Sequence, residues 1–298
     1  MAQPGFSSRR DRGFTLVEIA VVIVILALIL TMLLGISSTM IAQQRREATR
    51  VRLAAADTAL SLYVAQNRRL PCPADGSLAP GDALAGQEIK TGATPDFKCH
   101  LGGGVDSQTS GVLPWRTLGL TEADVTDGWG TRLTYRVDAA LVKDGAMNMT
   151  WCDPGGTRAP VPINASSGYC DSSVCTGTFS PPNCTQPSQV TLNKGLQVRN
   201  LAGIVIMDGA ANTGAAYIVV SHGENRAGGY DTQSIVQAAT GPAAGTEEAK
   251  NAANLPLQPY YVDDFAVYLD GSGHFDDFLI RPTILTVASR AQLGPRAH

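Results

Sequence analysis

The sequence has few of the residues from which catalytic sites are built. Only four of its 298 residues are histidine, and it contains no G-x-S-x-G nucleophile elbow, no phosphate-binding loop and no H-E-x-x-H zinc motif. Ser221 stands directly beside His222, but adjacent residues of a strand point to opposite faces and do not form a nucleophile and base pair. The sequence therefore predicts that the chain is not an enzyme.

Charge is absent from a long stretch near the N-terminus. No Lys, Arg, Asp or Glu occurs from Ile19 to Gln44, and residues 14–36 are strongly apolar. At about 1.5 Å per residue, this segment forms ~34 Å of helix, enough to cross a hydrocarbon core of about 30 Å. A secretory signal peptide would have a shorter apolar middle, about 7 to 15 residues, followed by small residues. Residues 14–36 are therefore predicted to span a membrane, with the short basic leader in the cytoplasm and the long remainder exported.

A single acid, Glu18, stands in the first turn of this segment. A carboxylate at the centre of a membrane span costs about 2.5 to 3.5 kcal/mol, and less near the end of the span. One interpretation is a helix cap, because an acid in the first turn interacts favourably with the helix dipole. The other interpretation is that a group of opposite charge on another molecule pairs with it.

The run RRDRGFTLVEIAVVIVILALIL resembles the N-terminus of type IV prepilins and of the pseudopilins of type II secretion. The resemblance implies that a prepilin peptidase cuts after Gly13 and that the new terminal residue, Phe14, is N-methylated. It also implies that Glu18 pairs with the terminal amine of a neighbouring subunit, which makes Phe14 and Glu18 the residues of subunit assembly. A buried carboxylate and ammonium stabilise each other, whereas either one alone is a costly buried charge.

The helix is predicted to continue beyond the apolar segment. No Gly or Pro occurs between Ile41 and Pro71, and the intervening residues are rich in Ala, Leu, Gln and Arg, which favour helix. Four apolar residues recur at spacings of three and four and form one stripe: Leu53, Ala56, Leu60 and Tyr63. One helix over residues 14–67 is expected, with its second half packed on a head domain. Arginines lie largely off the stripe, and with a net charge of −3 no nucleic-acid partner is expected.

The rest of the chain has the composition of short strands joined by turns. Gly, Pro, Ser, Thr and Asn become frequent, and five segments are predicted to be strands: 133–142, 203–209, 215–223, 263–273 and 274–285, with DGSG as the turn between the last two. The expected fold class is α+β, a pilin-like long N-terminal helix on an antiparallel sheet. The expected domains are a leader at 1–13, the helix at 14–68 and an extracytoplasmic head at 69–298.

The cysteines all follow the apolar segment and number six, an even count that fits disulfides in an oxidising compartment. They are Cys72, Cys99, Cys152, Cys170, Cys175 and Cys184. The region 152–184 is predicted to be a disulfide-pinned insertion, and zinc is the alternative, although no C-x₂-C pair occurs. Cys72 and Cys99 suggest a separate local bridge at the helix exit, but six cysteines allow fifteen pairings.

The stretch DVTDGWGTRLTYRVD resembles the Asp-Pro-Trp-Gly turn and Tyr-containing strand of pseudopilins related to the major type II secretion subunit. Asp127, Trp129, Gly130 and Tyr135 match, whereas Gly128 stands where the family has proline. The turn is therefore expected to be looser than in the family. We interpret it as a structural turn with Trp129 as a core anchor.

A later loop, YIVVSHGENRAGGYDTQS, resembles the loop that binds calcium in that family. Asn225 and Asp231 are the resulting calcium candidates, and no other cofactor is expected. The family's run of acids is missing, and Ca²⁺ takes six to eight oxygen ligands, so a glycine-rich surface turn is the alternative. The segment DGSGHFDD, with Asp270, Asp276 and Asp277, lacks the acid spacing of a calcium loop and is predicted to be an exposed hairpin.

Together these features predict a structural subunit of a type IV filament, a minor pilin or pseudopilin assembled through its N-terminal helix. The expected location is the inner membrane, with a single span and a periplasmic or extracellular head, and then the filament. The resemblance implies three kinds of partner: a prepilin peptidase, other pilins or pseudopilins, and an inner-membrane assembly platform with its ATPase. Membrane lipid is a further expected partner, because residues 14–36 are predicted to span a membrane. The alternative is an adhesin or ligand-recognition head displayed on a pilin-like stem, and the sequence does not distinguish a pilus from a type II secretion system.

Overall fold

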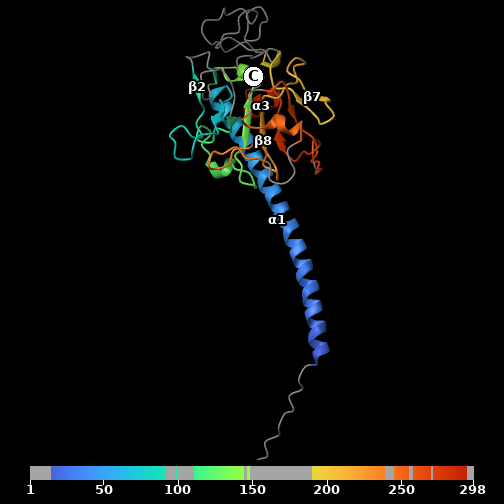
Figure 1. Cartoon of the computed structure of the whole chain (residues 1–298). Coiled ribbons are helices and arrows are strands. Elements are labelled where there is room, and N and C mark those ends of the chain that lie inside the picture. The colour runs from blue at the N-terminus through green and yellow to red at the C-terminus, as the bar shows by residue number, and fades with distance from the viewer. Residues whose placement is uncertain are drawn as a thin grey trace, which may run out of the picture. The chain divides into compact units, whose positions relative to one another are not determined.

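A computed structural model gives the fold of the chain (Figure 1). It describes residues 15–91, 98–99, 111–143, 146–147, 190–238, 245–254, 258–269 and 271–293, with only the backbone described at 32–39. The chain divides into two compact units, Met1–Gln44 and Arg45–His298. The boundary falls inside the long helix, because the second half of that helix supplies part of the core of the second unit.

Helix α1 spans Leu16–Asn67 and is 52 residues long. Its predicted end at residue 67 is confirmed, while Phe14 lies outside the described residues. Arg68 follows in the left-handed conformation, with a φ of 57°, and its N–H donates to the carbonyl of Val64. A left-handed residue directly after the last helical turn is a common way for a helix to end. Pro71 then prevents the helix from resuming.

The first unit contributes the N-terminal part of α1, in which every described side chain from Thr15 to Thr31 is exposed. Within the described residues, no helix is both long and apolar enough to cross a membrane. The predicted transmembrane segment 14–36 is therefore not confirmed.

The second unit is built around an antiparallel sheet, which confirms the α+β fold class. In the described part of the chain this sheet has five strands in the order β1-β4-β5-β8-β10. They are β1 Ala74–Asp75, β4 Gly111–Val112, β5 Thr134–Val137, β8 Tyr217–Ser221 and β10 Phe278–Ile280. The central pair is β5 and β8, with Thr134 opposite Val220 and Val137 opposite Tyr217.

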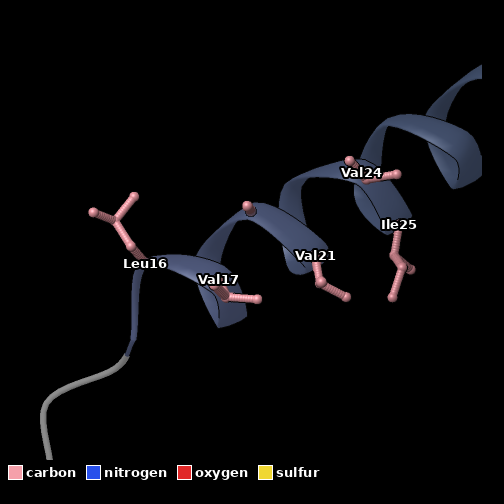
Figure 2. A pocket seen from close by; sticks show the side chains of 6 residues that line it. Leu16, Val17, Val21, Val24 and Ile25 are labelled. Atoms are coloured by element: carbon pink, nitrogen blue, oxygen red, sulfur yellow. The ribbon is translucent and has the colours of Figure 1, made fainter.

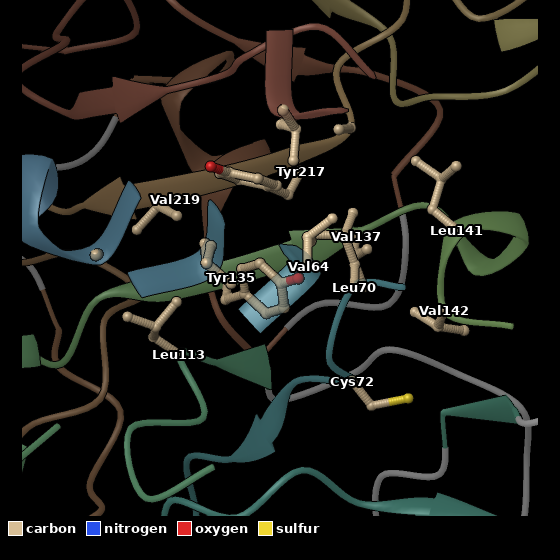
Figure 3. Close-up of a cluster of buried hydrophobic side chains, with 14 of the residues drawn as sticks. Val64, Leu70, Cys72, Leu113, Tyr135, Val137, Leu141, Val142, Tyr217 and Val219 are labelled. Atoms are coloured by element: carbon tan, nitrogen blue, oxygen red, sulfur yellow. The ribbon is translucent and has the colours of Figure 1, made fainter. Parts of the chain in front are cut away.

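The apolar stripe of α1 packs into the core of this unit, as predicted. Leu53, Ala56, Leu60 and Tyr63 are all buried. Figure 3 shows Val64 of α1 in the same cluster as Tyr135 of β5 and Tyr217 of β8. The hydroxyl of Tyr135 donates to the carbonyl of Pro71, so the sheet also holds the chain where it leaves the helix.

Smaller elements surround this core. A second sheet, in the order β7-β6-β9, joins Val205–Met207, Val198–Arg199 and Tyr261–Val262. Its β6 and β9 run parallel, a pairing that the sequence did not predict. A short antiparallel pair joins β2 Lys90–Thr91 and β3 Lys98–Cys99. The 3₁₀ turns in the described ranges are η1 Glu122–Val125, η2 Ala139–Leu141 and η3 Glu248–Asn251.

The predicted C-terminal strands are only partly correct. Residues 278–280 form β10, but the described residues of the segment 263–273 make only an isolated antiparallel bridge, between Val267 and Phe275. The strand predicted to reach residue 285 ends early, because helix α3 spans Ile284–Arg290. Thr283 caps that helix by accepting a hydrogen bond from the N–H of Thr286.

A disulfide joins Cys72 and Cys99, with their Cα atoms 5.3 Å apart. It links the segment after α1 to strand β3, at the position where the sequence suggested a local bridge. The other cysteines, Cys152, Cys170, Cys175 and Cys184, lie outside the described residues, as does the whole predicted insertion 152–184.

Candidate functional site

The first turn of α1 is closed by a reciprocal cap between Thr15 and Glu18. Oε2 of Glu18 accepts hydrogen bonds from the backbone N–H and the hydroxyl of Thr15, at 2.8 and 2.9 Å, and the N–H of Glu18 donates to the same hydroxyl at 3.3 Å. This is a capping box, in which a threonine and a glutamate three residues later satisfy each other's helix-end donors. The cap interpretation of Glu18 is thus realised in the structure of the isolated chain.

The cap leaves part of the carboxylate available. Its hydrogen bonds to Thr15 all use Oε2, and among the described residues Oε1 of Glu18 has no hydrogen-bond partner. Gly13 and Phe14, the expected processing residues, lie outside the described part of the chain. Capping and pairing with a second molecule are therefore compatible uses of one carboxylate.

An open apolar surface begins directly after the cap. It is lined by Leu16, Val17, Ala20, Val21, Val24 and Ile25, and Figure 2 shows that these side chains follow the first turns of the helix. The large apolar side chains from Leu16 to Leu30 are between 50% and 88% exposed. Contiguous apolar surface of this kind marks a site of interaction with protein or lipid.

The turn at residues 127–130 is fixed by Asp127, which is buried. Its Oδ1 accepts hydrogen bonds from the N–H groups of Trp129 and Thr131, and its Oδ2 accepts from the hydroxyls of Thr131 and Ser221. Trp129 is only half-buried and stacks on Phe278, with ring centroids 5.8 Å apart. The aspartate, rather than the tryptophan, is thus the most buried anchor of this turn.

Gly128 has a specific structural role where the family has proline. Its N–H donates to the hydroxyl of Thr49 on α1 at 2.9 Å, and that hydroxyl donates to the carbonyl of Arg45. A Cβ at Gly128 would lie 2.3 Å from the same carbonyl oxygen. The turn is therefore held closely against the helix by a contact that proline, which has no N–H, cannot make.

The two calcium candidates have separate partners. Asp231 caps its own turn, because its Oδ1 accepts from the N–H groups of Gln233 and Ile235 and its Oδ2 from the amide of Gln237. Asn225 is buried instead, and its amide contacts the carboxylate of Glu248. The described geometry does not show Asn225 and Asp231 sharing a ligand position, so calcium at this pair stays a prediction.

The expectation that DGSGHFDD is an exposed hairpin is wrong for its two last acids. Asp276 and Asp277 are buried, together with His274 and, from η3, Glu248. Residues 276 and 277 precede strand β10, which begins at Phe278. They are not part of a regular strand, so their side chains need not alternate between two faces, and both can be buried. Sequence reasoning missed Glu248 and His274, since nothing in the pattern around either of them indicates burial.

Burial changes the proton affinities in this region. It raises the pKa of Glu248 to about 7, aided by the neighbouring Asp276 carboxylate, and raises the pKa of Asp277 well above its usual range. Burial also lowers the pKa of His222 to about 3, with Arg136 as a further cause. Ser221 and His222 bond to different groups, Asp127 and Thr134, and do not contact each other as a nucleophile and base would.

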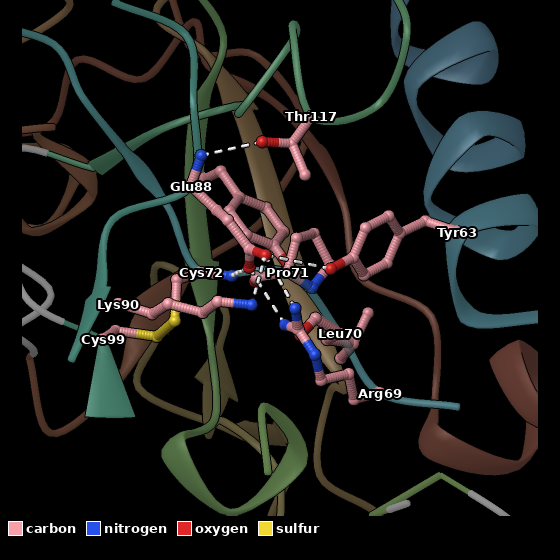
Figure 4. The surroundings of a disulfide bond; sticks show 10 residues. Tyr63, Arg69, Leu70, Pro71, Cys72, Glu88, Lys90, Cys99 and Thr117 are labelled. Atoms are coloured by element: carbon pink, nitrogen blue, oxygen red, sulfur yellow. Dashed lines mark hydrogen bonds and ion pairs between the residues drawn. A yellow bond between two sulfur atoms is a disulfide. The ribbon is translucent and has the colours of Figure 1, made fainter. Parts of the chain in front are cut away.

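A buried ion pair lies beside the disulfide (Figure 4). Arg69 donates to both carboxylate oxygens of Glu88, at 2.9 and 2.7 Å, and the N–H of Cys72 donates to the same carboxylate. Burial opposes ionisation of Glu88, but the hydrogen bonds and charge of Arg69 outweigh it and lower the pKa of Glu88 to about 2. This pair connects the end of α1 to the segment that carries the disulfide.

Comparison with known protein families finds a match at the N-terminus. The family model of the prokaryotic N-terminal methylation motif matches residues 8–34, a range that includes Gly13, Phe14 and Glu18. No curated protein and no solved structure matches the chain. The matched motif points to a structural subunit rather than an enzyme. The motif is similar to the N-terminus of type IV prepilins and pseudopilins, and the long N-terminal helix, the antiparallel sheet and the disulfide are consistent with a pilin-like fold.

Proposed function

We propose that this chain is a minor pilin or pseudopilin, a structural subunit of a type IV filament in a pilus or a type II secretion system. The observation that carries the proposal is the exposed apolar surface of α1 directly after a capped Glu18. A prepilin peptidase removes residues 1–13, and the helix is then stored in the inner membrane. An assembly platform and its ATPase transfer it to the filament.

The exposed apolar side chains between Leu16 and Leu30 must be shielded from water by lipid or by other protein when the subunit functions. Lipid covers them before assembly, and the helices of other subunits cover them afterwards, so the apolar surface need not meet water during transfer. The head lies outside the inner membrane in this proposal. The Cys72–Cys99 disulfide supports that location, because disulfides persist mainly in oxidising compartments.

Glu18 joins subunits through its charge in this proposal. Cleavage after Gly13 keeps Thr15, so the capping box survives, and it creates a new amine at Phe14. The carboxylate of Glu18 then pairs with the Phe14 amine of the neighbouring subunit. Within packed apolar helices this pairing is strongly favourable relative to either charge left alone.

The test compares Glu18→Gln with Glu18→Ala in the native host. Glutamine at this position still forms a capping box but has no charge, whereas alanine removes both the cap and the charge. If the charge of Glu18 is needed for assembly, both variants should be absent from the filament fraction that is sheared from the cells, or from the complex with other subunits. If Glu18 only caps the helix, Glu18→Gln assembles like the unaltered chain, and the assembly role is refuted.

Processing is tested by the intact mass of the protein from its native membrane. We expect a chain that begins at Phe14 and carries one added methyl group. A chain that keeps Met1–Gly13 would remove the support for filament assembly.

Deletion of residues 152–184 distinguishes a structural subunit from the alternative, a recognition head. A structural subunit should still assemble without that region, whereas an adhesin should lose its binding to surfaces.

A further inference from the structure

Three buried polar side chains converge in the second unit. Glu248 comes from η3, and His274 and Asp276 come from the turn before β10. Their exposed fractions are 2%, 1% and 1%. One ligand atom from each lies within 4.8 Å of the others. A histidine and two carboxylates are thus gathered at one point without contact with bulk water.

Two atoms of this cluster lack a hydrogen-bond partner among the described residues. They are Nε2 of His274 and Oδ1 of Asp276, which lie 3.7 Å apart, too far for a hydrogen bond. Nδ1 of His274 is 3.2 Å from the carbonyl oxygen of Leu269. Since a carbonyl only accepts, Nδ1 carries the proton and Nε2 presents a lone pair toward the carboxylate. Two lone pairs face each other in a buried space, where an unmatched polar atom is costly.

The other carboxylate oxygens are held in place by backbone N–H groups. Oδ2 of Asp276 accepts from the N–H groups of Glu224 and Asn225, at 2.7 and 2.9 Å. Oε2 of Glu248 accepts from the N–H of Gly245, and its Oε1 from the N–H of Asp276. Together with the bond from Nδ1 of His274, these contacts orient the ligands in the manner of the outer contacts that surround metal-binding side chains.

Glycines allow the segments to come together. A Cβ at Gly245 would lie 2.1 Å from the carbonyl oxygen of His274, and a Cβ at Gly223 would lie 2.3 Å from the carbonyl oxygen of Asp276. Each contact is closer than a side-chain carbon tolerates. The backbone is therefore pressed against the turn 274–276 from two sides.

We propose that Glu248, His274 and Asp276 form a zinc site. One imidazole nitrogen and two carboxylates are ordinary Zn²⁺ ligands, and three protein ligands plus a water complete its tetrahedron. Two ligands ~2.1 Å from zinc at a tetrahedral angle lie about 3.4 Å apart, close to the 3.7 Å between Nε2 of His274 and Oδ1 of Asp276. Ca²⁺ fits poorly, because it requires six to eight oxygen ligands.

The metal gives the head a cross-link beyond the disulfide. It joins η3 to the turn that leads into β10, and it replaces the unfavourable contact between lone pairs with coordination bonds. The site shares no ligand with Asp231, the acid of the predicted calcium loop. The rival arrangement is a proton shared between the carboxyl groups of Glu248 and Asp276, which leaves no place for a cation.

The experiment uses the full-length chain in detergent, stripped of metal with a chelator and dialysed against zinc. We expect one zinc ion per chain by elemental analysis. Thermal unfolding should shift upward by about 5 °C or more at a zinc concentration about 100 times the dissociation constant, and calcium should give no such shift. His274→Gln should lower zinc affinity by at least about tenfold, while Asp231→Asn, the matched control in the neighbouring loop, should bind zinc like the unaltered chain.

Three results would overturn the site. They are a folded chain that takes up no zinc, equal uptake by His274→Gln, and uptake that is lost when thiols are alkylated, which would assign the metal to cysteine. Should His274→Gln fail to fold, imidazole ¹⁵N spectra of the unaltered chain give the answer. Zinc should move the Nε2 resonance of one of the four histidines, and no movement at any histidine refutes the proposal.

Discussion

Replacing Gly128 with proline, the residue that the related turn contains, tests how the 127–130 turn is fixed against helix α1. Proline removes the N–H that donates to Thr49, which costs about 1 kcal/mol. It also adds a Cβ at a position 2.3 Å from the carbonyl oxygen of Arg45, and the resulting displacement of the turn costs about 1–3 kcal/mol. We therefore expect Gly128→Pro to lower the free energy of unfolding by about 2–4 kcal/mol.

Two further variants measure separately the effect of the close contact and the effect of the lost hydrogen bond. Gly128→Ala keeps the N–H and adds only the close contact, so it should cost about 1–3 kcal/mol. Thr49→Val keeps the shape of the side chain but leaves the N–H of Gly128 without its acceptor, which should also cost about 1–3 kcal/mol. Thr58→Val is the matched control, because the hydroxyl of Thr58 is exposed and donates only to Ala54 in its own helix. Its effect should stay within about 0.5 kcal/mol.

The assay is urea unfolding of the purified chain in detergent, followed by tryptophan fluorescence. Differences in midpoint at constant slope give the changes in free energy. If Gly128→Pro is as stable as the unaltered chain, or if Thr49→Val and Thr58→Val have equal effects, the contact between the turn and the helix is not what fixes the turn.

Three other predictions concern the head. Removing the disulfide by Cys72→Ala with Cys99→Ala, which frees a loop closed over a sequence separation of 27, should cost about 3–4 kcal/mol in urea unfolding. The pKa of Glu88 is lowered from 4.5 to about 2. Its ionised carboxylate therefore contributes about 3 kcal/mol to the free energy of unfolding above about pH 4.5, and this contribution is lost as the pH falls toward 2. Urea unfolding measured against pH should show this loss, and Glu88→Gln should abolish it. Leu60→Ala should cost about 2–5 kcal/mol because Leu60 is fully buried, whereas Leu62→Ala, at an exposed position of the same helix, should stay within about 0.5 kcal/mol.

The second half of the long helix could be predicted because its signals are local. The absence of Gly and Pro between Ile41 and Pro71 favours a continuous helix, and the repeat of Leu53, Ala56 and Leu60 follows the periodicity of a helix. The structure has the same end and the same buried stripe. The central strands β5 and β8 were also predicted from local signals, because short strand segments bounded by turn residues indicate strands. The last predicted strand was wrong at its C-terminal end, where Thr283 caps a short helix, because the apolar pattern of so few residues does not separate helix from strand.

The sequence by itself determined the N-terminal motif, the second half of the helix and the α+β class, because each depends on composition or on neighbours in the chain. Only the tertiary structure decided that Gly128 meets Thr49, that Asp127 anchors its turn, and that Asp276 is buried beside Glu248. These are contacts between residues far apart in sequence. Their partners are chosen by how the helix and sheet pack, and one sequence contains no periodicity that reports such contacts.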